Sequence, residues 1–240
     1  MRIAIVSDIH GNLTALEAVI ANLRVAAPDL VLHGGDLPHG GARPAEVVDR
    51  VRELGWKGVC GNTDEMLWAP ASLRDFAAKA PSMAKLFGMI EEMRLWVCER
   101  VGEESLAWLK GMPMLQRRGE VTLVHASPKD TWRGPSKDAD EVALRQAFRE
   151  LNSNVVVYGH IHQPYVREMG EWTVANSGSV SLSYDGDTRA SYAVVDDGKV
   201  EIRRVEYDVE REIEAMRLVR LPHGEWVGAC LRAGKFVPPE

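Results

Sequence analysis

Short apolar runs that end at carboxylate, amide or imidazole side chains are the feature that most constrains this sequence. The first run, Ile3 to Val6, reads as a buried strand, and Asp8 and His10 follow it in a loop. In open α/β sheets, ligands usually bind beyond the carboxyl ends of the strands. A carboxylate and an imidazole two residues apart can turn toward one point and share a cation. Taken alone the pair is weak evidence, because a strand-terminal Asp more often caps a helix.

The same arrangement recurs along the chain. Four further predicted strands end at polar residues of these types, namely Asp36, Asn62, His125, and His160 with His162. Asp and Asn are common in turns, and a lone strand-end histidine is more often a surface or core group. Turn chemistry does not readily explain seven such residues that all fall where strands stop. Oxygen and imidazole ligands without thiolates suit Mn²⁺, Fe, Zn²⁺ or Ni²⁺ better than Mg²⁺ or Ca²⁺. Seven ligands are too many for one cation and fit two.

Composition excludes several other classes of protein. A chain of 240 residues, 45% hydrophobic and 27% charged, is typical of one globular domain and not of disordered or fibrous proteins. The net charge of -6 argues against a stable nucleic-acid complex, which needs a positive surface. The three cysteines lack zinc-finger spacing and fit a reducing cytosol. No apolar run reaches about 18 residues, so we expect a cytoplasmic protein without membrane segments.

The first half of the chain begins as alternating strands and helices. Thr14 and Glu17 have the spacing of a capping box, which predicts the start of the first helix. Pro44 is expected to be the first residue of the second helix, and a third strand is predicted over 57–60. From about 66 to 119 the alternation of strands and helices stops, and a helix-rich segment is predicted. We interpret it as a cap over the site, although most of its apolar side chains could simply pack against the domain.

The second half is expected to become antiparallel after the strand that precedes His160. Strands are predicted over 172–175, 189–195 and 199–207, and Asp197-Gly198 predicts a hairpin turn between the last two. A helix is predicted from Val209, and residues 221–240 read as mostly irregular. The sequence therefore predicts a single domain over 1–240, with a helical cap insert at about 66–119 and a C-terminal helix and tail from about 208.

The order and spacing of these motifs resemble those of a known family. Asp8-Ile9-His10, Gly35-Asp36, Gly61-Asn62, His125 and Gly159-His160-Ile161-His162 resemble the calcineurin-like metallophosphoesterase superfamily. Within it, the segments HASP and NSGSV...DGDTRASYAVVD resemble the small bacterial phosphodiesterase branch. The resemblance implies an α/β fold, a four-layer α-β-β-α sandwich with two mixed central sheets and the metals at the sheet ends.

The resemblance also implies a role for each strand-end residue. Asp8, His10 and His162 would hold one metal, Asn62, His125 and His160 the other, and Asp36 would bridge them. The expected cofactors are two divalent transition metal ions, with manganese the first choice and iron, zinc or nickel as alternatives. Two such cations about 3.5 to 4 Å apart lower the pKa of a shared water, so that hydroxide can attack phosphorus at neutral pH.

The position after Asn62 departs from the family pattern. The family usually has a histidine there, implied to stabilise the transition state or protonate the leaving oxygen, and this chain has Thr63. A threonine hydroxyl can donate a hydrogen bond to a phosphate oxygen, but it is no acid near pH 7. His39, on the loop after the bridging Asp36, is the candidate substitute, and a solvated loop histidine is the alternative. Asp64 is expected to cap the next helix, and His33 to be a core or metal-supporting residue.

These observations predict a metal-dependent phosphoesterase that hydrolyses small phosphate esters and prefers phosphodiesters. The predicted catalytic residues are Asn62, Thr63 and His39, of which Thr63 and His39 also bind substrate. One alternative is a phosphomonoesterase that acts on nucleotides, dinucleoside polyphosphates or phosphoproteins. Another is a non-catalytic scaffold similar to a retromer subunit, although the presence of all seven ligand types argues against it. A homo-oligomer is compatible with the sequence.

Overall fold

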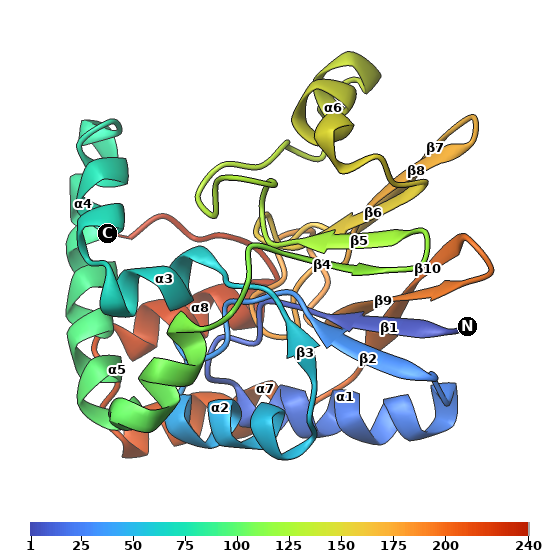
Figure 1. Ribbon diagram of the computed structural model, residues 1–240. Helices are drawn as coiled ribbons and strands as arrows, with labels where there is room; N and C mark the ends of the chain where they lie inside the picture. The colour runs from blue at the N-terminus through green and yellow to red at the C-terminus, as the bar shows by residue number, and fades with distance from the viewer. Residues whose placement is uncertain (240) are drawn as a thin grey trace.

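Two five-stranded sheets pack face to face in the computed structural model, which describes residues 1–239 (Figure 1). The first sheet has the strand order β10-β9-β1-β2-β3. Its strands are β1 (Ile3–Val6), β2 (Leu30–His33), β3 (Lys57–Gly58), β9 (Ala190–Asp196) and β10 (Lys199–Val205). β1, β2 and β3 are parallel, whereas β9 is antiparallel to β1 and forms a hairpin with β10.

The second sheet has the strand order β4-β5-β6-β8-β7. Its strands are β4 (Leu115–Arg118), β5 (Val121–Val124), β6 (Val155–Tyr158), β7 (Tyr165–Met169) and β8 (Trp172–Asn176). The three central strands are parallel, and β4 and β7 are antiparallel edge strands. Both sheets are therefore mixed, as predicted.

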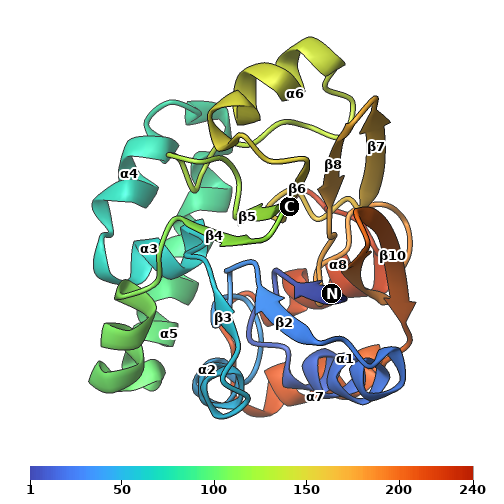
Figure 2. The same ribbon diagram turned by 45° about the vertical axis from the view of Figure 1, so that its right-hand side comes forward.

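Helices cover the outer face of each sheet (Figures 1 and 2). The first sheet carries α1 (Leu13–Ala26), α2 (Pro44–Glu53) and α7 (Val209–Leu218), and the second carries α6 (Glu141–Phe148) with the 3-10 turn η2 (Arg149–Leu151). The other helices lie toward the carboxyl ends of the parallel strands: α3 (Asn62–Trp68), α4 (Ala71–Ala77), the 3-10 turn η1 (Pro81–Met83), α5 (Ala84–Lys110) and α8 (Gly224–Ala233). Gly102, at φ 75°, interrupts α5.

Alternating side chains along the central strands build the core. Ile3 and Ile5 of β1 pack between the two sheets with Val155 and Val157 of β6, while Val6 faces the helices of the first sheet. A third cluster joins the second sheet to α6 and η2; its members include Val124, Val156, Tyr158, Val174, Leu144, Phe148 and Leu151. The order helices, sheet, sheet, helices confirms the predicted four-layer sandwich.

Several local predictions were wrong. Leu115–Arg118, placed at the end of the predicted helical segment, forms β4, and the helices of that segment end at Lys110. β8 is parallel to β6 because β7, which was not predicted, supplies the reversal of direction at the sheet edge. The tail was expected to be irregular, but α8 lies over Gly224–Ala233. The predicted strand 57–60 is limited to Lys57–Gly58.

The predicted cap of α1 was also wrong. Asn12 is the N-cap, and its side-chain oxygen accepts a hydrogen bond from the N–H of Ala15 at 2.9 Å. Thr14 is instead inside the helix, and its hydroxyl donates to Glu212 of α7 at 2.7 Å. Pro44 does begin α2, and the turn at Asp197-Gly198 has both residues at positive φ, as a tight hairpin requires. Among the described residues, no helix has the length and apolar character that crossing a membrane requires.

Candidate metal centre

The loops that carry the predicted ligands have an uncommon backbone conformation. Five ligands have a left-handed backbone with φ between 51° and 67°: Asp8, His10, Asp36, His160 and His162. None is glycine, and such a conformation costs on the order of 1–3 kcal/mol per residue. It persists only where the surrounding structure enforces it, and it is concentrated at functional sites. Here it turns both side chains of Asp-x-His and His-x-His toward one region.

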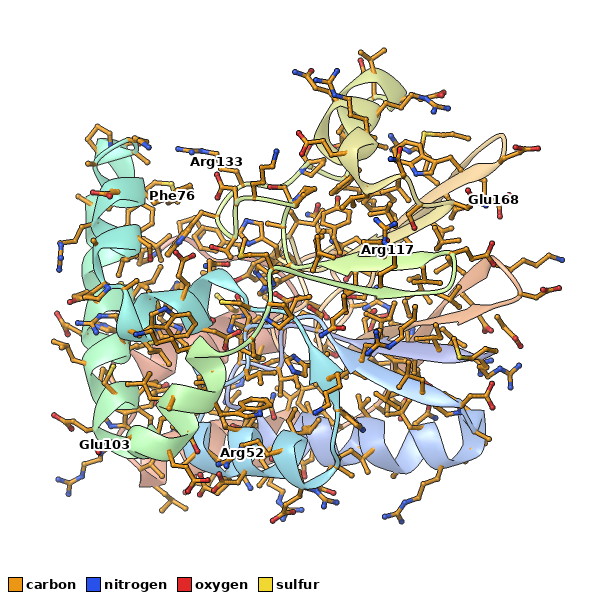
Figure 3. The ribbon with its side chains drawn as sticks, in the orientation of Figure 1. Arg52, Phe76, Glu103, Arg117, Arg133 and Glu168 are labelled. Atoms are coloured by element: carbon orange, nitrogen blue, oxygen red, sulfur yellow. The ribbon has the colours of Figure 1, made fainter. Side chains whose placement is uncertain are left out.

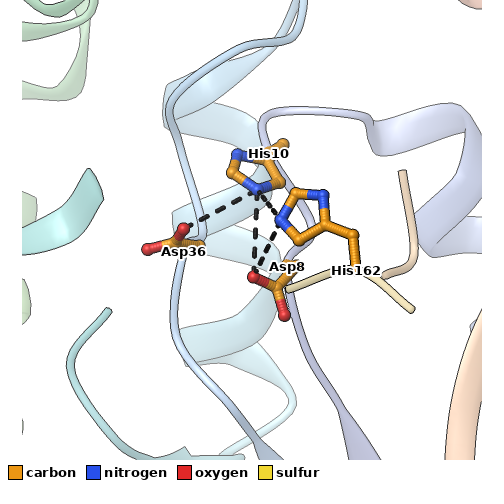
Figure 4. A group of neighbouring side chains, drawn as sticks. All are labelled: Asp8, His10, Asp36 and His162. Carbon is orange, nitrogen blue, oxygen red and sulfur yellow. Dashed lines mark hydrogen bonds and ion pairs between the residues drawn. The ribbon is translucent and has the colours of Figure 1, made fainter. Parts of the chain in front are cut away.

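Four of these side chains form a buried group that could hold a metal ion (Figure 4). The Nε2 atom of His162 lies 3.2 Å from Oδ1 of Asp8 and 3.1 Å from Nε2 of His10. The Nε2 atom of His10 lies 3.7 Å from Oδ2 of Asp36. One ligand atom from each of the four residues lies within 4.8 Å of the others. The loops after β1, β2 and β6 thus bring Asp8, His10, Asp36 and His162 together.

A second group lies on the other side of Asp36. Oδ1 of Asn62 is 2.9 Å from Nε2 of His125 and 3.0 Å from Nδ1 of His160. Nε2 of His125 is also 3.6 Å from Oδ1 of Asp36. The two carboxylate oxygens of Asp36 therefore face different groups, Oδ2 toward His10 and Oδ1 toward His125. The seven residues predicted as ligands therefore lie in two adjacent groups that share Asp36.

Backbone carbonyls fix the orientation of three histidine rings. Nδ1 of His10 lies 2.7 Å from the carbonyl of His39, that of His125 2.8 Å from Gly34, and that of His162 2.6 Å from Leu182. A carbonyl only accepts, so each Nδ1 carries the proton and donates it. The Nε2 lone pairs are then left to point into the site, which is the usual arrangement of metal-binding imidazoles.

The ionisation states of the site suit a cation. Burial and the neighbouring His162 ring lower the pKa of His10, and burial together with His125 lowers the pKa of His160 to about 4. Burial alone would raise the pKa of Asp8, but His162 and its other histidine neighbours hold it well below the usual range. Neutral imidazoles and ionised carboxylates are the forms that bind metals. His10, His160 and Asp8 are therefore in these forms, and the set of carboxylate oxygens and imidazoles fits a metal ion.

The pKa of His125 shifts in the opposite direction from the pKa values of His10 and His160. Burial lowers its pKa, but Asp36 and Asp8 outweigh that effect and raise the pKa above its usual value. The cause is the two buried carboxylates beside it, which attract positive charge of any kind. A proton on His125 and a metal ion are therefore alternative ways to satisfy the same negative centre.

A serine hydroxyl and backbone N–H groups hold the carboxylates of Asp8 and Asp36 in place. Asp8 accepts hydrogen bonds from the Ser7 hydroxyl at 2.6 Å and from the backbone N–H of His160 at 3.1 Å. Oδ1 of Asp36 accepts from the backbone N–H of Thr63 at 2.9 Å. A Cβ atom at Gly159 would collide with Ser7 and Asp8. Glycine in the Gly-His-Ile-His motif is therefore required by the close approach of two loops.

A cavity of about 110 Å³ adjoins the site. Its lining includes three predicted ligands, His10, Asn62 and His162, and both predicted substrate-binding residues, Thr63 and His39. The hydroxyl of Thr63 is buried and has no hydrogen-bond partner among the described residues. A free donor at this position is what the predicted contact with a phosphate oxygen needs.

His39 is not the solvated loop residue that was the alternative prediction, because it is buried. Its Nε2 atom lies 3.2 Å from the carbonyl of Ile90, to which it donates. Burial and the nearby His10 ring lower the pKa of His39 to about 4, so the ring is neutral at pH 7. A neutral ring whose N–H is already bonded argues against the predicted proton donor. What the structure does show is that the backbone carbonyl of His39 orients His10.

Three aromatic residues of the cavity were missed by sequence reasoning. Trp132 follows β5, Tyr184 precedes β9 and Trp226 belongs to α8. Tyr184 stacks on the His162 ring with centroids 4.7 Å apart. Nothing in the local sequence marks these residues, because they reach the site through long-range packing. Helix α5 contributes Ile90 and Met93 to the same wall, which agrees with a cap over the site.

Comparisons with known proteins agree with this geometry. The calcineurin-like phosphoesterase superfamily domain matches residues 1–199. The chain is 30% identical to Uncharacterized protein MJ0912 of Methanocaldococcus jannaschii over 97% of this chain and 98% of that protein. It is 30% identical to phosphodiesterase YfcE of Escherichia coli over 82% of this chain and 88% of that protein. The crystal structure of a metallophosphoesterase from Sphaerobacter thermophilus matches with a TM-score of 0.78 and 28% identity, over 98% of this chain and 100% of that one. The chain is therefore a metal-dependent phosphoesterase and belongs to the calcineurin-like phosphoesterase superfamily.

Proposed function

We propose that this protein hydrolyses phosphate esters with two divalent transition metal ions and prefers phosphodiesters. The observation that carries the proposal is the placement of Asp36. Its two carboxylate oxygens face two separate ligand groups, at 3.7 Å from His10 and 3.6 Å from His125. Asp8, His10 and His162 would hold one ion and Asn62, His125 and His160 the other. Manganese is the first choice for both positions, with iron, zinc or nickel as alternatives.

When bound, such a metal pair lowers the pKa of a coordinated water and neutralises charge on the phosphoryl group. The chain itself supplies the remaining functions. The hydroxyl of Thr63, which has no partner among the described residues, would donate a hydrogen bond to a phosphate oxygen. Asn62, next to Thr63 in the chain, holds His125 and His160 together through its side-chain oxygen, which lies 2.9 Å and 3.0 Å from these rings.

The preference for diesters has two supports. YfcE, which is 30% identical, is named a phosphodiesterase. In addition, neither of the two residues predicted to act at the leaving group is placed to protonate it, since Thr63 is no acid near pH 7 and the His39 N–H is donated to Ile90. Such a site favours leaving groups that depart without a proton. A phosphomonoesterase remains the second candidate. A retromer-like scaffold is the third candidate. A scaffold without catalytic activity has no need of seven converging ligands, so their presence argues against it.

Parallel assays with two chromogenic substrates test the proposal. We expect the purified protein to hydrolyse bis-p-nitrophenyl phosphate faster than p-nitrophenyl phosphate when Mn²⁺ is added, and neither after chelation. Asp36→Ala should abolish turnover while the circular dichroism spectrum stays native, whereas the exposed Asp138→Ala should be fully active. A marked monoester preference would favour the second candidate. No turnover with any of the four metals would favour the scaffold.

The remaining expectations concern the setting of the enzyme. We propose a cytoplasmic enzyme that acts on small phosphate esters and forms no stable complex with nucleic acid or membranes, and that can assemble as a homo-oligomer. The net charge of -6 and the free state of Cys60, Cys98 and Cys230 support the proposal. The helical insert at about 66–119 would act as a cap, because Ile90 and Met93 of this insert line the cavity beside the ligands.

A further inference from the structure

The indole N–H of Trp132 is a second unsatisfied donor at the catalytic cavity. Trp132 lines the cavity, and its Nε1 atom is buried without a hydrogen-bond partner among the described residues. Leaving a buried donor unpaired costs about 1–3 kcal/mol. Buried polar groups in native proteins are almost always paired, so an orphan of this kind needs an explanation. A ligand that enters the cavity would provide the missing acceptor.

The ring is held firmly where it is. Trp132 stacks on Phe76 of α4 with centroids 5.0 Å apart and an interplanar angle of 29°. Its backbone N–H donates to Asp130 at 2.8 Å, and the hydroxyl of the preceding Thr131 donates to Glu65 of α3. Arg133 lies over the Phe76 ring at 5.6 Å, and Figure 3 labels the two residues close together beside α4. The free N–H is therefore a preorganised donor and not the result of a mobile side chain.

A second tryptophan in the same wall provides the contrast. Trp226 also lines the cavity, but its indole N–H donates to the carbonyl of Val237 at 2.7 Å. The protein thus satisfies one cavity tryptophan internally and leaves the other free. Thr63 and Trp132, which carry the free donors, both lie in the chain close to ligands of the second group. Thr63 is next to Asn62, and the loop that contains Trp132 begins at His125.

The acceptor that the proposed reaction would bring into the cavity is an anionic phosphoryl oxygen. Among the described residues that line it, none is lysine, arginine, aspartate or glutamate. A phosphoryl group would meet the ligand groups on one side and only neutral donors on the other. Hydrogen bonds from neutral N–H and O–H donors to a charged oxygen are stronger than those between two neutral partners. Cationic side chains are not needed for this purpose when metal ions are present.

We propose that Trp132 is a substrate-positioning residue whose indole N–H, together with the Thr63 hydroxyl, binds a non-bridging phosphoryl oxygen. The inference rests on the proposed function and adds a residue that the family motifs do not include. Trp132→Phe removes the N–H and keeps an aromatic ring against Phe76. We expect it to lower kcat/KM for bis-p-nitrophenyl phosphate by about 10- to 100-fold, and to raise the inhibition constant of inorganic phosphate by a similar factor. Trp226→Phe should change both quantities less.

A nuclear magnetic resonance titration tests the contact without turnover. The Zn²⁺-loaded protein has seven indole N–H groups, and Trp132→Phe and Trp226→Phe each remove one resonance and so assign it. Inorganic phosphate should shift the Trp132 resonance downfield and leave that of Trp226 in place. If the wild-type protein hydrolyses the diester but the Trp132 resonance does not move, the inference is wrong and the proposed function stands. Loss of activity in Trp132→Phe without that shift would also overturn it, because a purely structural role would then explain the loss. If the wild-type protein lacks hydrolysis, the proposed function fails, while the titration still decides whether Trp132 binds phosphate.

Discussion

The Asp64 carboxylate accepts a hydrogen bond from the backbone N–H of Asp36 at 2.8 Å, across the loops that follow β2 and β3. The same carboxylate accepts from the N–H groups of Leu37 at 2.9 Å and Gly61 at 2.8 Å. The bond from Gly61 caps α3, as the sequence predicted. The other two bonds hold the left-handed Asp36 in position between the two ligand groups. Asp64 therefore supports the metal centre without facing it.

Asp64→Asn is expected to loosen this support. An amide has one acceptor oxygen, and its NH₂ group would face at least one of the three backbone donors. We expect the free energy of unfolding to fall by about 1–3 kcal/mol, and metal to bind more weakly. Urea unfolding and metal titration measure the two effects. Asp140→Asn is the matched control, because Asp140 caps α6 at the surface and Asn is an equally good cap. Equal stability of the Asp64 variant and this control would contradict the account.

His39→Ala separates positioning from proton donation. Since the His39 N–H is already donated to Ile90, we expect the variant to slow aryl phosphodiesters with good and poor leaving groups by the same factor. The measurement is kcat/KM across a series of diesters that differ in the pKa of the leaving phenol. A loss that grows with the pKa of the phenol would instead support the proton-donor role that the sequence suggested.

The burial of His33 should make the free energy of unfolding depend on pH. The ring is buried at the end of β2, and burial lowers its pKa from 6.5 to about 3. Below pH 6.5 His33 binds a proton in the unfolded chain but not in the folded protein. The free energy of unfolding is therefore at its full value above that pH and falls as the pH drops toward 3. Between pH 7 and pH 5 the wild type should lose about 2 kcal/mol more than His33→Gln. Urea unfolding at the two pH values tests this, because the other histidines are common to both proteins. Parallel losses in the two proteins would show that His33 is protonated in the folded state.

The apolar strands and the ligands that follow them could be predicted from the sequence. Ile3–Val6 and Val155–Tyr158 are continuous apolar runs because both faces of these strands are covered, one by the other sheet and one by helices. Asp8 and His160 follow strands of different sheets, β1 and β6, and they meet because the two sheets pack face to face with these strand ends on the same side. The motifs therefore predicted the fold class and the residues that lie together at the ends of the strands.

The edge strands and the cavity wall could not be predicted in the same way. Leu115–Arg118 contains one apolar residue in four because one side of this edge strand faces solvent, so its sequence carries no strand signal. Helix α8 contains Gly228 inside it and lacks a side-chain cap, so packing against Ile213 of α7 stabilises it more than local propensity does. The N–H of Trp226 is paired only because the Val237 carbonyl of the C-terminal segment reaches it. Long-range contacts of this kind have no local signature.

The metal content of the protein tests the central claim most directly. Asp36 is proposed to bridge two ions, each with its own ligands, so equilibrium dialysis against Mn²⁺ followed by elemental analysis should give two ions per wild-type chain. His125→Ala removes a ligand of the second group and keeps the buried group of Asp8, His10, Asp36 and His162, so it should retain one ion. A wild-type chain that binds only one ion, or a His125→Ala variant that still binds two with unchanged affinity, would contradict the account.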